Sequence, residues 1–229
     1  MLHWPIVKPL VVAVDGPSGA GKGTVARAAA RALGYRHVDT GAMYRAVAWR
    51  ARQTGLAFDD TAGVASVAAQ AAFDLTDGIV AIDGHDVTGA IRTPEIDKAA
   101  ALVARNAAVR EVLVARQRTL GADGGVVMEG RDIGTVVFPD AEVKIYLDAS
   151  QEERARRRAA DPAHASSQTG DVAHVAEDLA ARDRSDTTRS VAPLAQAPDA
   201  VYIDTTGVTV DEVVSRVLAL VREKAAASG

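Results

Sequence analysis

The sequence predicts an α/β fold in which a parallel sheet lies between two layers of helices. Short apolar runs with the length of buried strands alternate with helical segments, which is typical of parallel strands joined by helical crossovers. The first run also leads through a glycine-rich loop directly into an alanine-rich helix. The predicted strands cover residues 10–14, 36–38, 125–128, 143–147 and 200–203.

The composition limits the class of protein. The 229 residues suffice for one core with small insertions, and a net charge of −4 argues against a general binder of nucleic acid or acidic membranes. The absence of cysteine excludes disulfides and thiolate metal sites. We expect a cytoplasmic protein without membrane contact, because no leader segment opens the chain and no apolar run approaches the roughly 18 residues of a span.

The loop after the first predicted strand has the anatomy of a phosphate-binding site. Its glycines let successive backbone N–H groups point at an anion, and the dipole of the helix predicted over Lys22–Leu33 adds positive charge. The spacing from Gly16 to Lys22 matches the pattern G-x-x-x-x-G-K. Gly23 replaces the usual hydroxyl residue, and Thr24 follows. An ordinary glycine turn is the alternative, but strand, spacing, lysine and helix all favour a phosphate cradle.

A second group of polar residues follows the strand predicted over residues 36–38. Asp39 and Thr40 stand at its carboxyl end, where open α/β sheets bind ligands. Thr40 could instead serve only as the N-cap of the helix predicted over residues 42–54. Arg45 lies in the first turn of that helix, where the dipole favours acids, and this indicates an anionic partner for it.

The segment between the second and third predicted strands forms an insertion. A helix is predicted over residues 61–72, and Asp-Gly turns predict a small antiparallel sheet over residues 73–88. A long helix is predicted over residues 96–120, because a proline precedes it and a glycine follows it. Arg105 and Arg110 lie on this helix, where arginines are usually solvated, so position alone favours no binding role for them.

Charged residues crowd around two glycines directly after the third predicted strand. The run 129–135 reads EGRDIGT. A plain turn would need the glycines but not the charges, so we predict a second part of the site here. The fourth predicted strand ends at Asp148, and either Asp148 or Ser150 is expected to cap the next helix.

That next helix is rich in arginine. Arg154, Arg157 and Arg158 fall at i, i+3 and i+4 and share one face, where they repel one another unless an anion lies nearby. After a polar break at residues 161–171, a further helix is predicted over residues 172–184.

If helical geometry continues, Arg182, Asp186 and Arg189 also share a face. We interpret residues 154–189 as a mobile, arginine-rich flap. A solvated helix pair with internal salt bridges is the alternative, but the first helix has few acids to neutralise its arginines. An amphipathic helix predicted over residues 208–223 closes the chain.

These motifs make the chain similar to the bacterial cytidylate kinases, and a glycine loop ending in GKGT is typical of nucleoside monophosphate kinases. The matching segments are DGPSGAGKGT at 15–24, DTGAMYRA at 39–46, IRTPEI at 91–96, EGRDIGTVVFPDA at 129–141 and SVAPL at 190–194. The resemblance implies a single P-loop kinase domain over residues 1–229 with strand order 2-3-1-4-5. It also implies an insert at about 40–105 that binds the nucleoside monophosphate (the NMP-binding insert). A helical segment at about 154–189, the LID, is expected to close over the site.

The implied activity is transfer of the γ-phosphoryl group of ATP to CMP or dCMP, with Mg²⁺ as cofactor. Thr24 would reach the metal. The resemblance assigns ATP binding to Gly16, Pro17, Ser18, Gly19, Ala20, Gly21, Lys22, Gly23 and Thr24. The residues expected to stabilise the transferring group are Lys22, Arg131, Arg157 and Arg158.

The resemblance also assigns a CMP site. Its residues are Thr40, Arg45, Arg110, Arg131, Asp132, Arg182, Asp186 and Arg189. Thr40 and Arg45 would hold the phosphate, and Asp132 would accept from the cytosine amino group. The family often has a serine as a second acceptor where this chain has Ala101, which leaves Asp132 as the main reader of the base.

The chemistry of phosphoryl transfer suits these residues. It needs positioning and charge neutralisation, and the acceptor phosphate, with a second pKa of about 6, needs no general base at neutral pH. None of the five histidines lies in a candidate motif.

Two other functions stay open. One is a P-loop kinase for AMP, UMP or a non-nucleotide acceptor. The other is a nucleotide-dependent switch without an acceptor. Two observations argue against a switch: the second set of arginines, and the lack of an evident Walker-B motif with a glutamine to position a hydrolytic water. We expect a monomer, because no strip of exposed apolar residues stands out.

Overall fold

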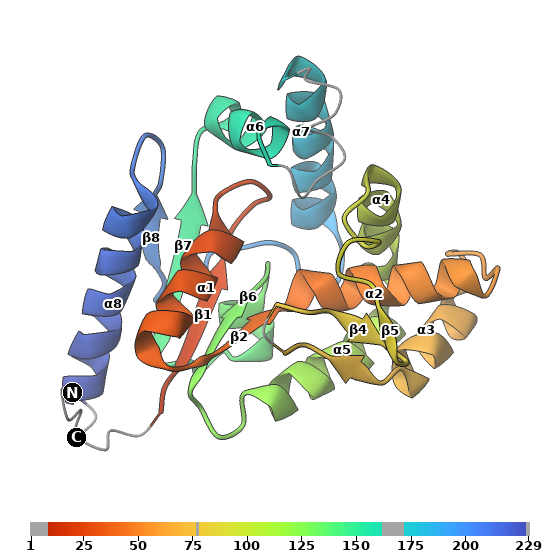
Figure 1. Cartoon of the computed structure of the whole chain (residues 1–229), viewed down its shortest axis with the longest axis horizontal. Helices are drawn as coiled ribbons and strands as arrows, with labels where there is room; N and C mark the ends of the chain where they lie inside the picture. The colour runs from red at the N-terminus through yellow and green to blue at the C-terminus, as the bar shows by residue number, and fades with distance from the viewer. Residues whose placement is uncertain (1–8, 77, 162–171, 228–229) are drawn as a thin grey trace.

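The computed structural model describes residues 9–76, 78–161 and 172–227. At its centre lies a five-stranded parallel sheet with the order β2-β6-β1-β7-β8 (Figure 1). Counted along the chain within this sheet, the order is 2-3-1-4-5, which confirms the prediction. Every strand lies within one residue of its predicted bounds. The strands are β1 (Val11–Asp15), β2 (Arg36–Asp39), β6 (Val126–Glu129), β7 (Val143–Asp148) and β8 (Val201–Asp204).

Helices cover both faces of this sheet, as the three-layer prediction requires (Figure 1). On one face, α1 (Lys22–Leu33) packs against α8 (Val210–Ala227) and both bury apolar side chains against the strands. The π-helix η1 (Ile133–Val137) and α5 (Ala107–Leu120) cover the other face. Because successive strand residues point to opposite faces, β1 contributes to both cores and fixes the loop that follows it between them.

An insertion between β2 and β6 carries further helices and a second sheet. Its helices before α5 are α2 (Thr40–Gln53), α3 (Thr61–Gln70) and α4 (Pro94–Val103). The second sheet is antiparallel, as predicted, with strands β3 (Phe73–Asp74), β4 (Ala81–Ile82) and β5 (His85–Asp86). The insertion has its own apolar cores, so it can hold a rigid shape beside the main sheet.

The long helix predicted over residues 96–120 is wrong, because α4 and α5 replace it. The helix ends before Asn106, whose Oδ1 accepts from the backbone N–H of Ala108 at 3.1 Å and so caps α5. Asn106 Nδ2 also donates to the carbonyl oxygen of Thr61 at 2.8 Å. The break lets α4 turn away from α5 toward the flap (Figure 1).

The helices of the predicted flap are α6 (Gln151–Ala159) and α7 (Val172–Thr188). They stand over the carboxyl end of the sheet, and α7 lies beside α4 of the insertion (Figure 1). Ala155 of α6 packs on Val175 and Leu179 of α7 in a small apolar core of its own. The pair is therefore joined internally and separate from the main cores.

The boundaries of the flap differ in detail from the prediction. Ser150, rather than Asp148, caps α6 by accepting from the N–H of Glu153 at 3.2 Å. The second helix continues four residues beyond residue 184, its predicted end, and α8 runs over 210–227 rather than 208–223. Most of the predicted polar break, residues 162–171, lies outside the described residues. None of the helices in the described part of the chain is both long and apolar enough to traverse a bilayer.

Candidate active site

The glycine loop between β1 and α1 adopts a conformation that only glycine fits at Gly16. Its φ is 145°, and a Cβ added there would lie 1.9 Å from the carbonyl oxygen of Leu147 on β7. The loop ends at Gly21, a left-handed N-cap with φ 86° and no side chain to satisfy the first N–H groups of α1. Free N–H groups at a helix N-terminus form a binding site for an anion. This helix start opens into a cleft of about 880 Å³.

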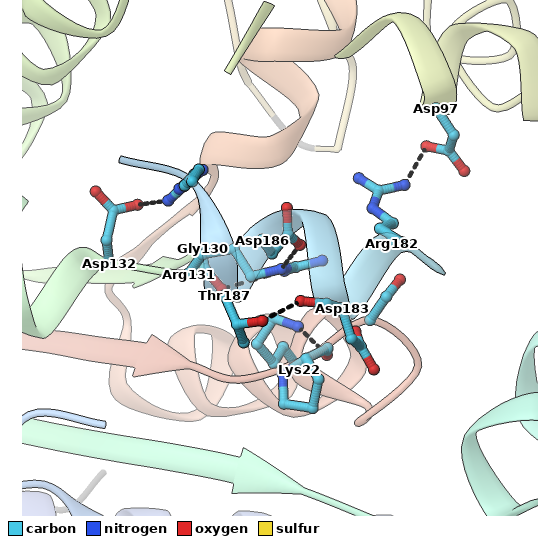
Figure 2. Close-up of polar contacts among 12 residues, drawn as sticks. Lys22, Asp97, Gly130, Arg131, Asp132, Arg182, Asp183, Asp186 and Thr187 are labelled. Carbon is cyan, nitrogen blue, oxygen red and sulfur yellow. Dashed lines mark hydrogen bonds and ion pairs between the residues drawn. The ribbon is translucent and has the colours of Figure 1, made fainter. Parts of the chain in front are cut away.

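Lys22 is buried, although a lysine in a glycine-rich loop is expected from sequence to face solvent. Only 7% of the residue is exposed. Its Nζ donates to the carbonyl oxygen of Pro17 at 2.6 Å, so the side chain folds over its own loop (Figure 2). Burial, and then the nearby Arg131, lower the pKa of Lys22, against the opposing influence of Glu129. A bound phosphate would favour the charged lysine and relieve this cost.

The carboxylate of Glu129 lies close to the glycine that follows this lysine. A Cβ at Gly23 would lie only 3.3 Å from Glu129 Oε1, so a larger residue there would crowd the carboxylate. The same Oε1 pairs with Nε2 of His37 at 2.9 Å. No histidine lies in a motif that the sequence analysis singled out. His37 reaches Glu129, the first residue of the run 129–135, because β2 pairs in parallel with β6.

The residues at the start of α2 are held by side-chain contacts. Asp39 is the N-cap, accepting from the N–H of Ala42 at 2.9 Å, so the alternative of Thr40 as cap is wrong. Thr40 Oγ1 instead donates to the carbonyl oxygen of Glu129 at 2.7 Å. Arg45 Nη2 donates to Asp39 Oδ2 at 2.9 Å, which gives this arginine an anionic partner within the protein. Its Nε is buried and has no hydrogen-bond partner among the described residues.

Arg110 is buried, which contradicts the expectation that an arginine on this helix is solvated. Only 3% of it is exposed, and its Nη2 donates to Asp132 Oδ2. Arg189 Nη2 donates to the other carboxylate oxygen of Asp132 at 3.2 Å. Arg110 also lies 5.8 Å from the ring centre of Tyr44 in a cation–π contact. Asp132 is therefore held between two guanidinium groups that come from α5 and from the end of α7.

Arg131 pairs with Asp186 from the flap. Arg131 Nε donates to Asp186 Oδ2 at 2.8 Å, and Figure 2 shows the two side chains meeting above Lys22. Although burial acts to raise it, Arg131 and then Arg182 hold the pKa of Asp186 below its usual value. Since α7 extends to Thr188, Arg182, Asp186 and Arg189 share the cleft side of the flap, as the spacing predicts.

The arginines of α6 divide into two kinds. Glu153 accepts from Arg156 at 2.7 Å and from Arg157 at 2.8 Å, so the alternative of salt bridges within the helix is correct for these two. Arg157 also donates to Oγ1 and O of Thr205, at 2.8 and 2.6 Å. Arg158 instead reaches the glycine loop.

Arg158 Nη2 donates to Ser18 Oγ at 2.8 Å. Burial lowers the pKa of Arg158 to about 10. Arg154 donates to the carbonyl oxygen of the same Ser18 at 3.2 Å and pairs with Asp183 of α7. The flap therefore touches the glycine loop directly.

The cleft brings nearly all predicted site residues together. Ser18 to Thr24 line it, and so do the other predicted residues except Gly16 and Pro17, which are buried within the loop. The predicted residues from outside the loop that line the cleft are Thr40, Arg45, Arg110, Arg131, Asp132, Arg157, Arg158, Arg182, Asp186 and Arg189.

Sequence reasoning missed Thr205, which is buried in the cleft wall, although its place directly after the fifth strand was a usable signal.

Three buried guanidinium nitrogens in this cleft lack a hydrogen-bond partner in the described residues. They are Arg45 Nε, Arg110 Nη1 and Arg182 Nε, from α2, α5 and α7. Buried donors are nearly always paired, so three unpaired donors on residues that line one cleft indicate a missing acceptor. An anion with several oxygens would satisfy donors that arrive from three directions. The cleft therefore offers one anion site at the glycine loop and a second among these arginines.

Comparison with known families agrees with this geometry. A family model described as cytidylate kinase matches residues 12–223. The chain belongs to the cytidylate kinase family. A cytidylate kinase of Desulfitobacterium hafniense is 47% identical over 220 residues, covering 95% of this chain and 94% of the relative. A cytidylate kinase of Pelotomaculum thermopropionicum is 50% identical over 215 residues, covering 92% and 95%.

Membership in the cytidylate kinase family confirms the resemblance inferred from the motifs.

Among solved structures, a gluconokinase from Sinorhizobium meliloti has a TM-score of 0.47 at 19% identity, with 95% of each chain covered.

Proposed function

We propose that the protein transfers the γ-phosphoryl group of ATP to CMP or dCMP, giving ADP and CDP or dCDP. The observation that carries the proposal is the single cleft that joins the glycine loop to a second set of arginines with unsatisfied buried donors. A switch that only binds a nucleotide has no use for the second set. Residues 1–229 are proposed to act as one kinase domain, with the NMP-binding insert at about 40–105 and the LID at about 154–189.

ATP is proposed to bind at the start of α1. The backbone of residues 16–24 would surround its phosphates, and Lys22 would move its ammonium group from Pro17 to the β- and γ-phosphates. The exposed hydroxyl of Thr24 lines the cleft beside this loop. The described residues contain no group of three or more acids and histidines that could hold a metal alone.

This donor set fits Mg²⁺, which usually binds through few protein oxygens together with phosphates and water. Thr24 is proposed to hold the ion. When bound, Mg²⁺ neutralises part of the phosphate charge.

CMP is proposed to bind among the arginines. Thr40 and Arg45 would hold its phosphate, together with Arg131 and Arg110, which line the same cleft. Asp132 accepts from two arginines in this structure, and a carboxylate has further lone pairs with which to accept from a cytosine amino group.

Arg182, Asp186 and Arg189 would close over the sugar and phosphate. Ala101 lines the cleft and offers no polar group to the base.

Transfer needs the two phosphates close together in a dry cleft. Arg131, Arg157 and Arg158 are proposed to stabilise charge as it shifts from ATP to the acceptor. Arg158 already contacts the glycine loop through Ser18, so its cation lies between the two proposed anion sites. Closure of α6 and α7 would exclude water that otherwise hydrolyses ATP. A monomer in the cytoplasm, with these small molecules as its only partners, completes the proposal.

Labelled ATP tests this function. With a radioactive γ-phosphate on ATP and with CMP present, the label should appear in CDP. Label that appears only as inorganic phosphate, with or without CMP, would instead indicate a nucleotide-hydrolysing switch. Transfer of label to UMP or AMP in preference to CMP would indicate a kinase for a different acceptor.

A further inference from the structure

An ion pair joins the insertion to the flap away from the glycine loop. Asp97 Oδ1 of α4 lies 3.1 Å from Arg182 Nη1 of α7, with 17% and 19% of the two side chains exposed. Figure 2 shows the pair at the end of the polar network that is remote from Asp132. Asp97 does not line the main cleft, whereas Arg182 does. Asp97 can therefore act on a bound nucleotide only through residues of the cleft, of which Arg182 is its ion-pair partner.

The contact between α4 and α7 is otherwise loose. A cavity of about 240 Å³ lies between the two helices, and both apolar residues, such as Ala101 of α4 and Leu179 of α7, and charged residues, including Asp97 and Arg182, line it. Close packing does not fix the distance between the helices at this cavity. The ion pair at its edge is thus placed to set how far the flap stands from the insertion.

Asp97 also faces more than one cation. Although burial acts to raise the pKa of Asp97, Arg182, Arg45 and Arg158 hold it below its usual value. These arginines come from α7, α2 and α6, so the carboxylate offsets repulsion among cations that three elements bring together. Arg182 keeps a buried Nε donor without a hydrogen-bond partner in the described part of the chain. The ion pair through Nη1 thus holds this guanidinium near α4, while Nε stays available as a donor.

We propose that Asp97 is a positioning residue that holds Arg182, and with it α7, against the insertion before the acceptor nucleotide arrives. The proposal rests on the proposed function for the role of Arg182 at the acceptor. Asp97 itself makes no contact with the nucleotide. Loss of its charge should let the flap move away from α4 and should weaken acceptor binding, because the flap then has to be ordered on binding.

The absence of cysteine makes a direct distance measurement possible. Spin labels would be attached to cysteines introduced at Leu102 on α4 and Glu177 on α7, which are both exposed. Without nucleotide, Asp97→Asn should shift the distance between labels to longer values and broaden it relative to the labelled parent. Glu95→Gln is the matched control, because it breaks an exposed ion pair with Arg52 inside the insertion. An Asp97→Asn distribution equal to that of the control would overturn the proposal.

Arg182→Gln breaks the same pair from the flap and should lengthen the distance likewise, which keeps the test valid if Asp97→Asn does not fold. Kinetics then separate positioning from chemistry. Asp97→Asn should raise KM for CMP roughly tenfold while kcat changes by less than about threefold, and Asp97→Glu should recover part of the loss. A fall in kcat at unchanged KM would contradict the proposed role. Failure of the parent to phosphorylate CMP would refute the proposed function but leave the distance result intact.

Discussion

Arg110 and Asp132 form an ion pair with only 4% and 8% of their side chains exposed, although 22 residues separate them in the chain. The pair joins α5 of the insertion to the loop after β6 of the main sheet. Because the pair is buried, removal of Asp132 leaves the charge of Arg110 without compensation, whereas Asp132 keeps Arg189 as a partner if Arg110 is removed. The same loop carries Arg131, so the pair fixes the wall of the cleft at which we propose the acceptor base binds.

Asp132→Ala should reduce the preference for CMP over UMP, mainly by weakening CMP. Uracil has a carbonyl where cytosine has an amino group, so with UMP the oxygens of the base and of the Asp132 carboxylate would face each other without a hydrogen bond between them. Since Ala101 supplies no second acceptor, most of the discrimination should depend on Asp132. The measurement is kcat/KM for both acceptors in wild type and variant. An unchanged ratio would place base recognition elsewhere.

The structure adds a control to this experiment. Asp132→Ala also leaves Arg110 and Arg189 without their shared partner, so it should lower stability as well as selectivity. Asp132→Asn keeps the volume and one acceptor oxygen. It should disturb the packing less while still altering the ratio, and thermal unfolding of both variants separates the two effects.

Lys22→Ala should lower turnover by about 10²- to 10³-fold, because a cation aimed at the transferring phosphates is lost. The buried stem means that some stability is lost too, on the order of 1 kcal/mol for the carbonyl oxygen of Pro17 left without its donor. Lys22→Met retains the stem and should lose turnover equally. Retention of more than about a tenth of wild-type turnover in either variant would refute the ATP site.

Arg158→Ala and Arg157→Ala should lower kcat, on the order of 10²-fold or more, with little change in the dissociation constant for CMP. Arg158 lies beside the glycine loop through Ser18, where charge develops during transfer. Arg156→Ala is the matched control, since that side chain is 67% exposed and pairs with Glu153 on its own helix. Calorimetry that shows lost CMP binding at unchanged kcat would move the two residues to the acceptor site.

Asp15 should make stability fall as pH rises from about 4 to about 6. Its oxygens accept from the N–H groups of Ile133 and Gly134 at 2.8 and 2.7 Å, which ties β1 to η1. Burial nevertheless raises the pKa of Asp15 from 3.8 to about 6. The folded state thus keeps a proton that the unfolded state releases at lower pH. The shift corresponds to about 3 kcal/mol of unfolding free energy that is present below pH 4 and lost above pH 6.

Comparison with Asp15→Asn isolates this contribution. The unfolding free energy of wild type minus that of the variant, from urea titrations at several pH values, should decrease between pH 4 and 6 and then level off. A difference that stays constant or increases over this interval would show that burial does not dominate at Asp15.

Local sequence patterns predicted the central sheet and the phosphate loop well. Apolar runs and glycines are short-range signals, and α1 has its predicted bounds, from Lys22 to the left-handed Gly34. The run 129–135 was also found from local signals, because charges around glycines follow a strand. These features depend on residues close together in the chain.

Features that depend on distant partners were not predicted. The Asn106 cap that separates α4 from α5 is supported by the carbonyl oxygen of Thr61, 45 residues away. Burial of Lys22 follows from the flap and the strand ends that cover it, which no local pattern records. The pairing of Arg182 with Asp97 joins two elements that become neighbours only in the folded chain.

The most direct test of the proposed function is ADP release measured with CMP, dCMP, UMP, AMP and no acceptor under identical conditions. The structure leads us to expect rapid release with CMP and dCMP, slower release with UMP and AMP, and almost none without an acceptor. Lys22→Ala should be close to background with every acceptor. ADP release that is equally fast without an acceptor, or faster with AMP or UMP than with CMP, would contradict the assignment of the arginine-lined half of the cleft to CMP.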